Sequence, residues 1–149
     1  MEWIEIGCAD SEKMILKKLS MNRPFEIKFT SINEVRMGSP YNSCNIELIG
    51  FDKLKLPEVG WQDKFAWTND SKKLILIKWD FENNIPGFHL FLIETETGIT
   101  KESRRIMGLP NSISISGYKV KLNKFLYNKE KTEPGKLCCE IEEEYEFDN

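Results

Sequence analysis

The sequence predicts a mainly β protein, an antiparallel meander or sandwich with one short N-terminal helix. Three observations lead to this prediction. Two long apolar runs, residues 74–81 and 88–93, are joined by a short polar turn. Other runs alternate apolar and polar residues, as half-buried strands do. Segments rich in Gly, Pro, Asn, Asp and Ser separate the runs at short intervals, which is typical of turns between strands.

The N-terminal part predicts the helix and then a change of period. Ser11 is a suitable N-cap, and Met14, Ile15 and Leu19 form a partial apolar stripe that ends before Pro24. After Pro24 the apolar residues recur at every second position, which favours strands. These alternating residues are Phe25, Ile27 and Phe29, followed by Cys44, Ile46 and Leu48.

The middle of the chain predicts a central hairpin. Residues 74–81 and 88–93 are apolar on both faces, so we expect two central strands joined by a turn at residues 83–87. Residues 99–106 are more polar and predict an edge strand.

The C-terminal part predicts three further strands. Ile113 and Ile115 mark the first strand, and Tyr118, Val120 and Leu122 mark the second. The apolar phase then slips, which predicts a bulge near Lys124. The last strand is expected at residues 138–147, for a total of about nine strands.

Residues 65–106 resemble one blade of a β-propeller of the tryptophan–aspartate-repeat-like kind. The resemblance implies a meander of antiparallel strands for less than a third of the chain. No second copy follows at the spacing of about 40 residues that such repeats keep, so no propeller binding site is inferred. The matching segments are Phe65-Ala66-Trp67, Asn69-Asp70-Ser71-Lys72-Lys73-Leu74 and Ile93-Glu94-Thr95-Glu96-Thr97-Gly98.

Length and composition predict a single domain, residues 1–149, with one substantial core. The net charge of −3 argues against nucleic acid or an anionic membrane as a partner. The N-terminus has no basic leader, and no apolar run reaches the length of about 20 residues that a spanning helix needs. The four cysteines form no C-x-x-C pair. We therefore expect a cytoplasmic protein with reduced thiols.

The last strand carries the clearest candidate site. Acidic residues occupy its even positions and mostly apolar residues its odd positions, so one face would present a row of carboxylates while Glu143 interrupts the other face. Lys119 and Lys121 of the preceding strand could neutralise this row. Alternatively, the row could bind a basic partner. The acidic residues are Glu140, Glu142, Glu144, Glu146 and Asp148.

Other residues are weaker candidates. Trp61, in a loop beside Gly60, is expected at the surface as a partner contact. His89 stands in an apolar strand without metal-ligand partners and is expected to be hydrogen-bonded and largely buried. Arg104 and Arg105 would lie on opposite faces of an edge strand, which does not suit a phosphate clamp. The vicinal cysteines, Cys138 and Cys139, precede acidic residues and are expected to be inert.

These observations favour a non-enzymatic protein-binding domain without a cofactor or metal. Its most specific form is an immunity-type or antitoxin-type inhibitor that binds a basic bacterial protein. The alternative is a β-sandwich or barrel module that holds a small ligand, with Trp and Phe side chains lining a pocket and His89 or Asp80 at its mouth. An exposed edge strand at residues 99–106 could also pair with a second copy of the chain.

Overall fold

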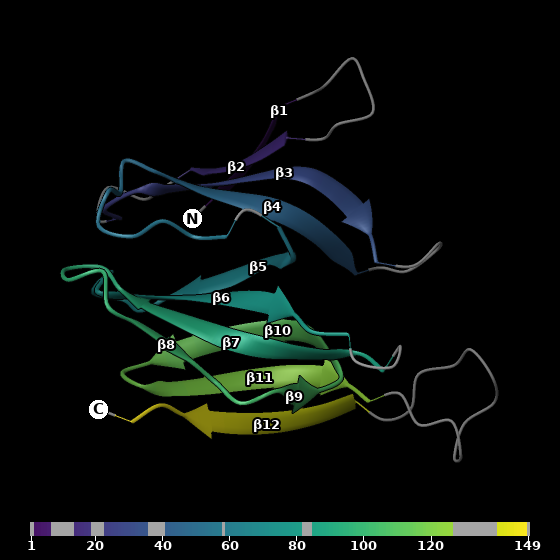
Figure 1. The fold of residues 1–149 in the computed structure, drawn as a ribbon. Coiled ribbons are helices and arrows are strands. Elements are labelled where there is room, and N and C mark those ends of the chain that lie inside the picture. Colours follow the sequence, from purple (N-terminus) through teal and green to yellow (C-terminus); the bar gives the residue numbers. More distant parts are fainter. Residues whose placement is uncertain are drawn as a thin grey trace.

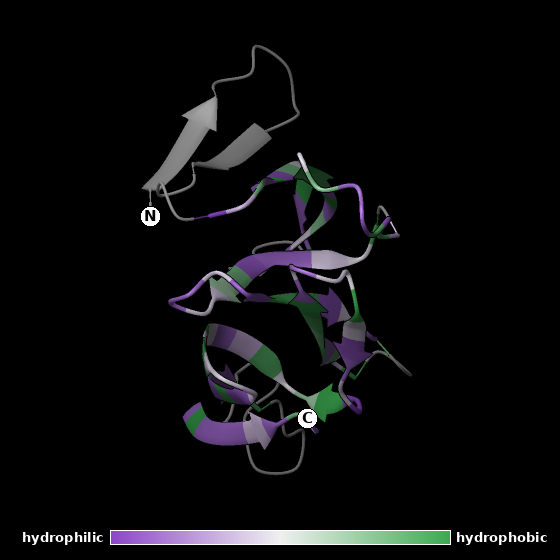
Figure 2. Ribbon diagram, turned by 90° about the vertical axis from the view of Figure 1, so that its left-hand side faces the viewer, coloured by the Kyte–Doolittle hydropathy of each residue, from purple (hydrophilic) through white to green (hydrophobic). Residues whose placement is uncertain are grey.

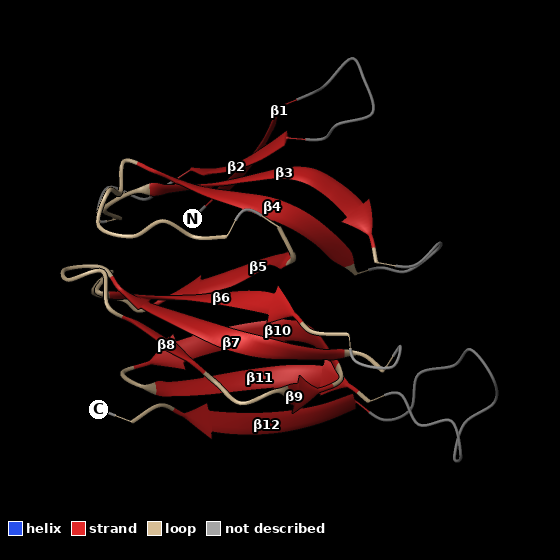
Figure 3. Ribbon diagram, in the orientation of Figure 1, coloured by secondary structure: helices blue, strands red, loops and turns tan. Residues whose placement is uncertain are grey.

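The computed structural model describes residues 2–6, 14–18, 23–35, 41–57, 59–81, 85–126 and 140–148, the first two ranges as backbone alone. Figure 3 shows these residues as strands and loops without a helix. The mainly β, antiparallel fold class is therefore confirmed. The described residues form twelve strands, which are β1 (Glu2–Ile6), β2 (Met14–Lys18), β3 (Glu26–Glu34), β4 (Asn42–Ile49), β5 (Trp61–Trp67), β6 (Lys73–Trp79), β7 (Gly87–Glu94), β8 (Thr100–Glu102), β9 (Ile106–Met107), β10 (Leu109–Ser116), β11 (Lys119–Phe125) and β12 (Glu140–Glu146).

The strands follow one another as three meanders, β1–β4, β5–β8 and β10–β12 (Figure 1). The first two belong to one nine-stranded sheet, but a single residue pair, Cys44 opposite Trp61, joins β4 to β5. The short β9 pairs with β7, and β10–β12 form a separate three-stranded sheet. All of these pairings are antiparallel, as hairpin connections require.

The predicted central hairpin is confirmed. β6 and β7 pair without a register shift from Lys73 opposite Glu94 to Trp79 opposite Phe88. Each has a neighbour on its other side, β5 and β8 respectively. Because successive side chains point to opposite faces, the continuous apolar runs fill a core on each side of this sheet.

Two hydrophobic clusters lie on opposite faces of β6 and β7. Leu74 and Leu76 of β6 pack with residues of β3, β4 and β5, whereas Ile75 and Ile77 pack with residues of β10 and β11. Each of these four β6 side chains is fully buried. Figure 2 shows that both apolar (green) and hydrophilic (purple) stretches occur along the described strands.

Two of the predicted secondary-structure elements differ from the structure. The predicted N-terminal helix is not found, since Met14–Lys18 form β2, paired with β1 and β3, while Ser11 and Leu19 lie outside the described residues. An amphipathic run of this length is ambiguous, and neighbouring strands decide its conformation. The predicted edge strand at residues 99–106 is two short strands, β8 and β9, separated by Ser103–Arg105.

The bulge predicted near Lys124 lies in the strand opposite. The register shifts between Pro110 and Ser112 of β10, so Asn111 is the extra residue, facing Asn123 and Lys124. β11 itself keeps its alternation, and Lys124 is buried. The apparent slip in the sequence arises because a lysine occupies an inward position.

Candidate protein-binding surface

The acidic residues of β12 lie on one exposed face, as the sequence predicted. The side chains of Glu140, Glu142, Glu144 and Glu146 are exposed, while the residues between them are partly covered. Asp148 follows the strand and is also exposed. Its backbone carbonyl accepts a hydrogen bond from Lys101 of β8, which anchors the end of this segment.

The two lysines that could neutralise this row stand beside it. In the β11–β12 register, Lys119 faces Glu146, Lys121 faces Glu144 and Asn123 faces Glu142. The Lys119 ammonium lies 3.7 Å from a Glu144 carboxylate oxygen, and both side chains are about half exposed. Such a pair contributes at most about 1 kcal/mol.

Neutralisation by β11 is incomplete. Four glutamates of β12 share this face with two lysines, and the third β11 residue is the uncharged Asn123. The Ser112, Ser114 and Ser116 side chains of β10 are exposed beyond the lysines and add no charge. The face therefore keeps an excess of two carboxylates along its β12 edge.

Glu143 is explained by a partner that the sequence pattern did not reveal. Its carboxylate points inward and lies 2.6 Å from the ammonium of Lys124. The Lys124 side chain is only 6% exposed, against 37% for Glu143. A buried charge is stable only with a close partner of opposite sign. Glu143 and Lys124 are thus the two charged residues on the inner faces of β12 and β11, and they neutralise each other.

The prediction that Trp61 lies on the surface is wrong. Its side chain is fully buried, and its indole N–H donates to the Pro57 carbonyl at 2.7 Å. The ring packs edge-on against Phe91 with 5.4 Å between centroids. Trp61 begins β5, beside the junction with β4, and this position places its large apolar ring inside the core.

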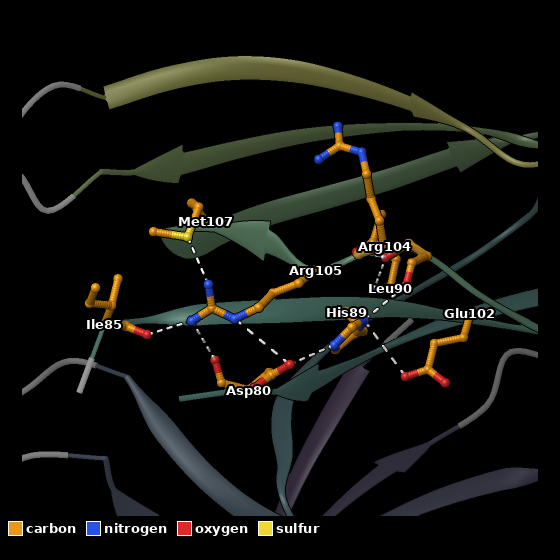
Figure 4. Close-up of polar contacts among 9 residues, drawn as sticks. Asp80, Ile85, His89, Leu90, Glu102, Arg104, Arg105 and Met107 are labelled. Carbon is orange, nitrogen blue, oxygen red and sulfur yellow. Dashed lines mark hydrogen bonds and ion pairs between the residues drawn. The ribbon is translucent and has the colours of Figure 1, made fainter. Parts of the chain in front are cut away.

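A second polar cluster surrounds His89 on β7 (Figure 4). Its Nε2 lies 2.8 Å from a carboxylate oxygen of Asp80, and its Nδ1 lies 2.8 Å from the carbonyl oxygen of Ser103. Both oxygens accept hydrogen bonds, so both ring nitrogens must donate and the imidazole is protonated in this arrangement. The hydrogen-bonded, largely buried histidine predicted from the sequence is confirmed, with 21% of its side chain exposed.

The electrostatics of this cluster agree with a protonated imidazole. Partial burial lowers the pKa of His89. The hydrogen bonds to Ser103 and Asp80 and the negative charges of Glu102 and Asp80 raise it, and together they outweigh the effect of burial. The pKa of His89 therefore lies above the ordinary value of 6.5. Glu102 contributes from 3.7 Å. The neighbouring carboxylates of Asp80 and Glu102 therefore favour the protonated form of His89.

Arg105 belongs to the same cluster and connects the segment between β8 and β9 with the segment between β6 and β7. Its guanidinium donates to the backbone carbonyls of Asp80 at 3.0 Å and Ile85 at 2.7 Å. Arg104 is exposed and lies near the Tyr145 ring, with 5.8 Å to the centroid. The two arginines do not converge, in agreement with the sequence, but they lie between β8 and β9 rather than along an edge strand.

The His89 cluster lacks the arrangement of a nucleophilic site. The Ser103 hydroxyl accepts from the Leu90 N–H at 2.8 Å and donates to the Arg104 carbonyl at 2.7 Å, so it is directed away from the imidazole. A nucleophile must lie within hydrogen-bond reach of its base. The cluster instead connects β7 with the segment between β8 and β9. The pairing of Asp80 with Arg105 has no sequence signal, because these residues are 25 positions apart.

The described part of the chain offers no reactive thiol. Cys44 is buried, and burial, followed by the charge of Asp63, raises the pKa of its thiol, which makes it unreactive. Cys138 and Cys139 lie outside the described residues.

Within the ranges given above, no group of three or more His, Cys, Asp and Glu side chains could hold a metal ion. The described residues include no helix that could cross a membrane.

Comparisons with known proteins do not assign this chain to a family. No protein-family model, no curated protein and no solved structure matches this chain.

Proposed function

We propose that this protein binds another, basic protein through the acidic face of β12, and that it acts as an immunity-type or antitoxin-type inhibitor. The observation that carries the proposal is the row of exposed carboxylates, Glu140, Glu142, Glu144 and Glu146, which the two lysines of β11 only partly neutralise. An unbalanced row of like charges on a strand is unfavourable for the free protein. A basic partner would relieve this repulsion and would be attracted to the face at long range.

The state of the interior also favours binding at the surface. The buried side chains of the two described apolar clusters are at most 8% exposed. The aromatic residues of the alternative pocket are used in packing, since Trp61 and Trp79 are buried and donate their indole N–H groups to backbone carbonyls. His89 and Asp80 bond each other rather than opening toward a cavity. These contacts support a binding protein over a module that encloses a small ligand.

The test is capture of a partner by three versions of the tagged protein. Wild type is compared with a variant in which Glu142, Glu144 and Glu146 are changed to Gln, using lysate of the source organism at low and high salt. The control carries Glu47→Gln, Asp52→Gln and Glu96→Gln, which remove the same charge from exposed residues elsewhere. Glutamine retains the size of glutamate and avoids placing new cations beside Lys119 and Lys121.

We expect wild type and the control to retain one basic protein at low salt and to release it at high salt. The β12 variant should lose most of that protein, with an affinity at least about tenfold lower, because charge attraction between close groups exceeds about 1.4 kcal/mol in total. Circular dichroism and urea unfolding check that each variant is folded. Equal retention by the β12 variant would contradict the proposed function.

A further inference from the structure

In the described part of the chain, β12 lies at an edge of its three-stranded sheet. Among the described strands it pairs with β11 alone, whereas β11 lies between β10 and β12 (Figure 1). The pairing runs over seven residues, from Phe125 opposite Glu140 to Lys119 opposite Glu146, without a register shift. A strand at an edge presents backbone N–H and C=O groups on which a further strand can pair.

The register shows which residues present those groups. The backbone N–H of Phe147 donates to the carbonyl of Tyr118 at 2.8 Å, so this pair continues the β11–β12 register as a hydrogen-bonded pair. In an antiparallel ladder, residues alternate between bonding toward one neighbour and toward the other. Odd-numbered residues of β12 therefore bond toward β11, and the N–H and C=O groups of Glu140, Glu142, Glu144 and Glu146 point to the open edge.

The same four residues carry the exposed carboxylates. The lysines of β11 stand on one flank of the carboxylate row only, because Lys119 and Lys121 face it across the β11–β12 register. Along the other flank the row meets the open edge. A strand added there would place its own side chains directly opposite the glutamates, about 5.5 Å away between Cα atoms. Cations at those positions would complete a row of alternating charge across three strands.

This geometry also discriminates between occupants. Two copies of this chain paired through β12 would set glutamates opposite glutamates, which is unfavourable. Among the other described edge strands, β8 of the nine-stranded sheet has three residues, among them Lys101 and Glu102, and its charge is mixed. The β12 edge is therefore suited to a foreign strand of positive charge.

We infer that β12 binds its partner by strand addition, and that the bound segment is an extended stretch with Lys or Arg at every second residue. The added strand lies antiparallel to β12 and exchanges backbone hydrogen bonds with Glu142, Glu144 and Glu146. The inference rests on the proposed function, because it specifies how the acidic face recognises a basic protein. Backbone pairing provides affinity, and the spacing of the cations provides register and specificity.

The first test uses synthetic peptides and the wild-type protein. The probe is an acetylated, amidated Thr-Lys-Thr-Lys-Thr-Lys-Thr peptide, and the control has the same residues with the three lysines adjacent. Two further probes carry methyl groups on backbone nitrogens, one at the three lysines and one at three of the four threonines, the third, fifth and seventh residues of the peptide. In the inferred register the lysine N–H groups face β12, whereas the threonine N–H groups face away.

Isothermal titration calorimetry at low salt measures the affinity of each peptide, and amide exchange measures protection of the backbone N–H groups of Glu142, Glu144 and Glu146. We expect the alternating peptide to bind more tightly than the control and to protect these amides. Methylation of the backbone nitrogens of the lysines should weaken binding by about tenfold or more, because hydrogen bonds to β12 are lost. Methylation of the backbone nitrogens of the threonines should have little effect. Equal effects of the two methylation patterns, or no binding of the alternating peptide, would overturn strand addition.

A second test acts on the protein and on the captured partner. Glu144→Pro and Glu144→Ala both remove one carboxylate, but only proline also removes the N–H that points to the open edge. Proline is tolerated at such a position because no bond to β11 is lost. We expect Glu144→Pro to bind the partner at least about fivefold more weakly than Glu144→Ala. If the two variants bind equally while the Gln variants still lose the partner, strand addition is wrong and the proposed function stands.

Discussion

Neutralising Glu143 should cost more stability than neutralising Lys124, although the two residues form one ion pair. The Lys124 ammonium lies 2.6 Å from the Glu143 carboxylate, and the lysine side chain is 6% exposed whereas the glutamate side chain is 37% exposed. Glu143→Gln leaves a cation that has little access to water. Lys124→Met leaves a carboxylate that can turn to water while the methionine retains most of the aliphatic packing.

The expected magnitudes follow from this asymmetry. At an effective dielectric constant of about 20, the attraction at this distance is roughly 6 kcal/mol, most of which offsets the cost of desolvation. Stranding a fully buried charge costs about 3–5 kcal/mol, and a glutamine oxygen still accepts from the ammonium, so we expect about 2 kcal/mol for Glu143→Gln. We expect about 1 kcal/mol for Lys124→Met, and about 1 kcal/mol for the double variant, which has no buried charge. The coupling between the two sites is then about 2 kcal/mol.

Urea unfolding at neutral pH measures these differences, provided that the slopes of the transitions agree. Glu144→Gln serves as a control, because Glu144 lies on the exposed face of the same strand and its loss should change stability by no more than about 0.5 kcal/mol. The reasoning would be refuted by a Lys124→Met cost equal to or above that of Glu143→Gln. Additive effects in the double variant would refute it as well.

Two further predictions concern the His89 cluster. Because the pKa of folded His89 is raised above 6.5, its stabilising effect is complete below that pH and is lost as the pH rises through the folded value. The difference in unfolding free energy between wild type and His89→Gln should therefore be larger at pH 5.5 than at pH 8.5, and a constant difference would show that the imidazolium contacts do not stabilise the fold. A Cβ on Gly87 would lie 2.6 Å from the Arg105 guanidinium carbon. Gly87→Ala should thus cost about 1 kcal/mol in wild type and about zero in an Arg105→Ala background, as measured by thermal unfolding, whereas an equal cost in both would exclude a clash with Arg105.

Residue periodicity predicted a strand best where the whole of each strand face was either buried or exposed. β6 and β7 carry apolar residues on both faces because each contributes side chains to both clusters, and the sequence alone shows this pattern. The alternation of β12 likewise predicted which of its residues are exposed. The same method misassigned Met14–Lys18, because a short apolar run suits a strand as well as a helix.

Exposure of a single residue was harder to predict than the strand that carries it. Trp61 was expected at the surface because glycine and proline precede it nearby, but the β4–β5 junction places its ring in the core. The slip of the apolar phase predicts a bulge near Lys124, but this lysine points inward, which is rare for the residue type. Its partner Glu143 is 19 residues away, across a strand pairing whose register the sequence does not reveal.

By itself, the sequence determined the fold class, the central hairpin and the acidic row of the last strand, because these depend on the alternation of neighbouring side chains along one strand. Only the tertiary structure decided that Lys119 and Lys121 stand on one flank of that row and that no described strand pairs along the other flank. It also brought Asp80, His89 and Arg105 together and paired Lys124 with Glu143. These features depend on which strands are adjacent and in which register, and such contacts between distant residues leave no local pattern in the chain.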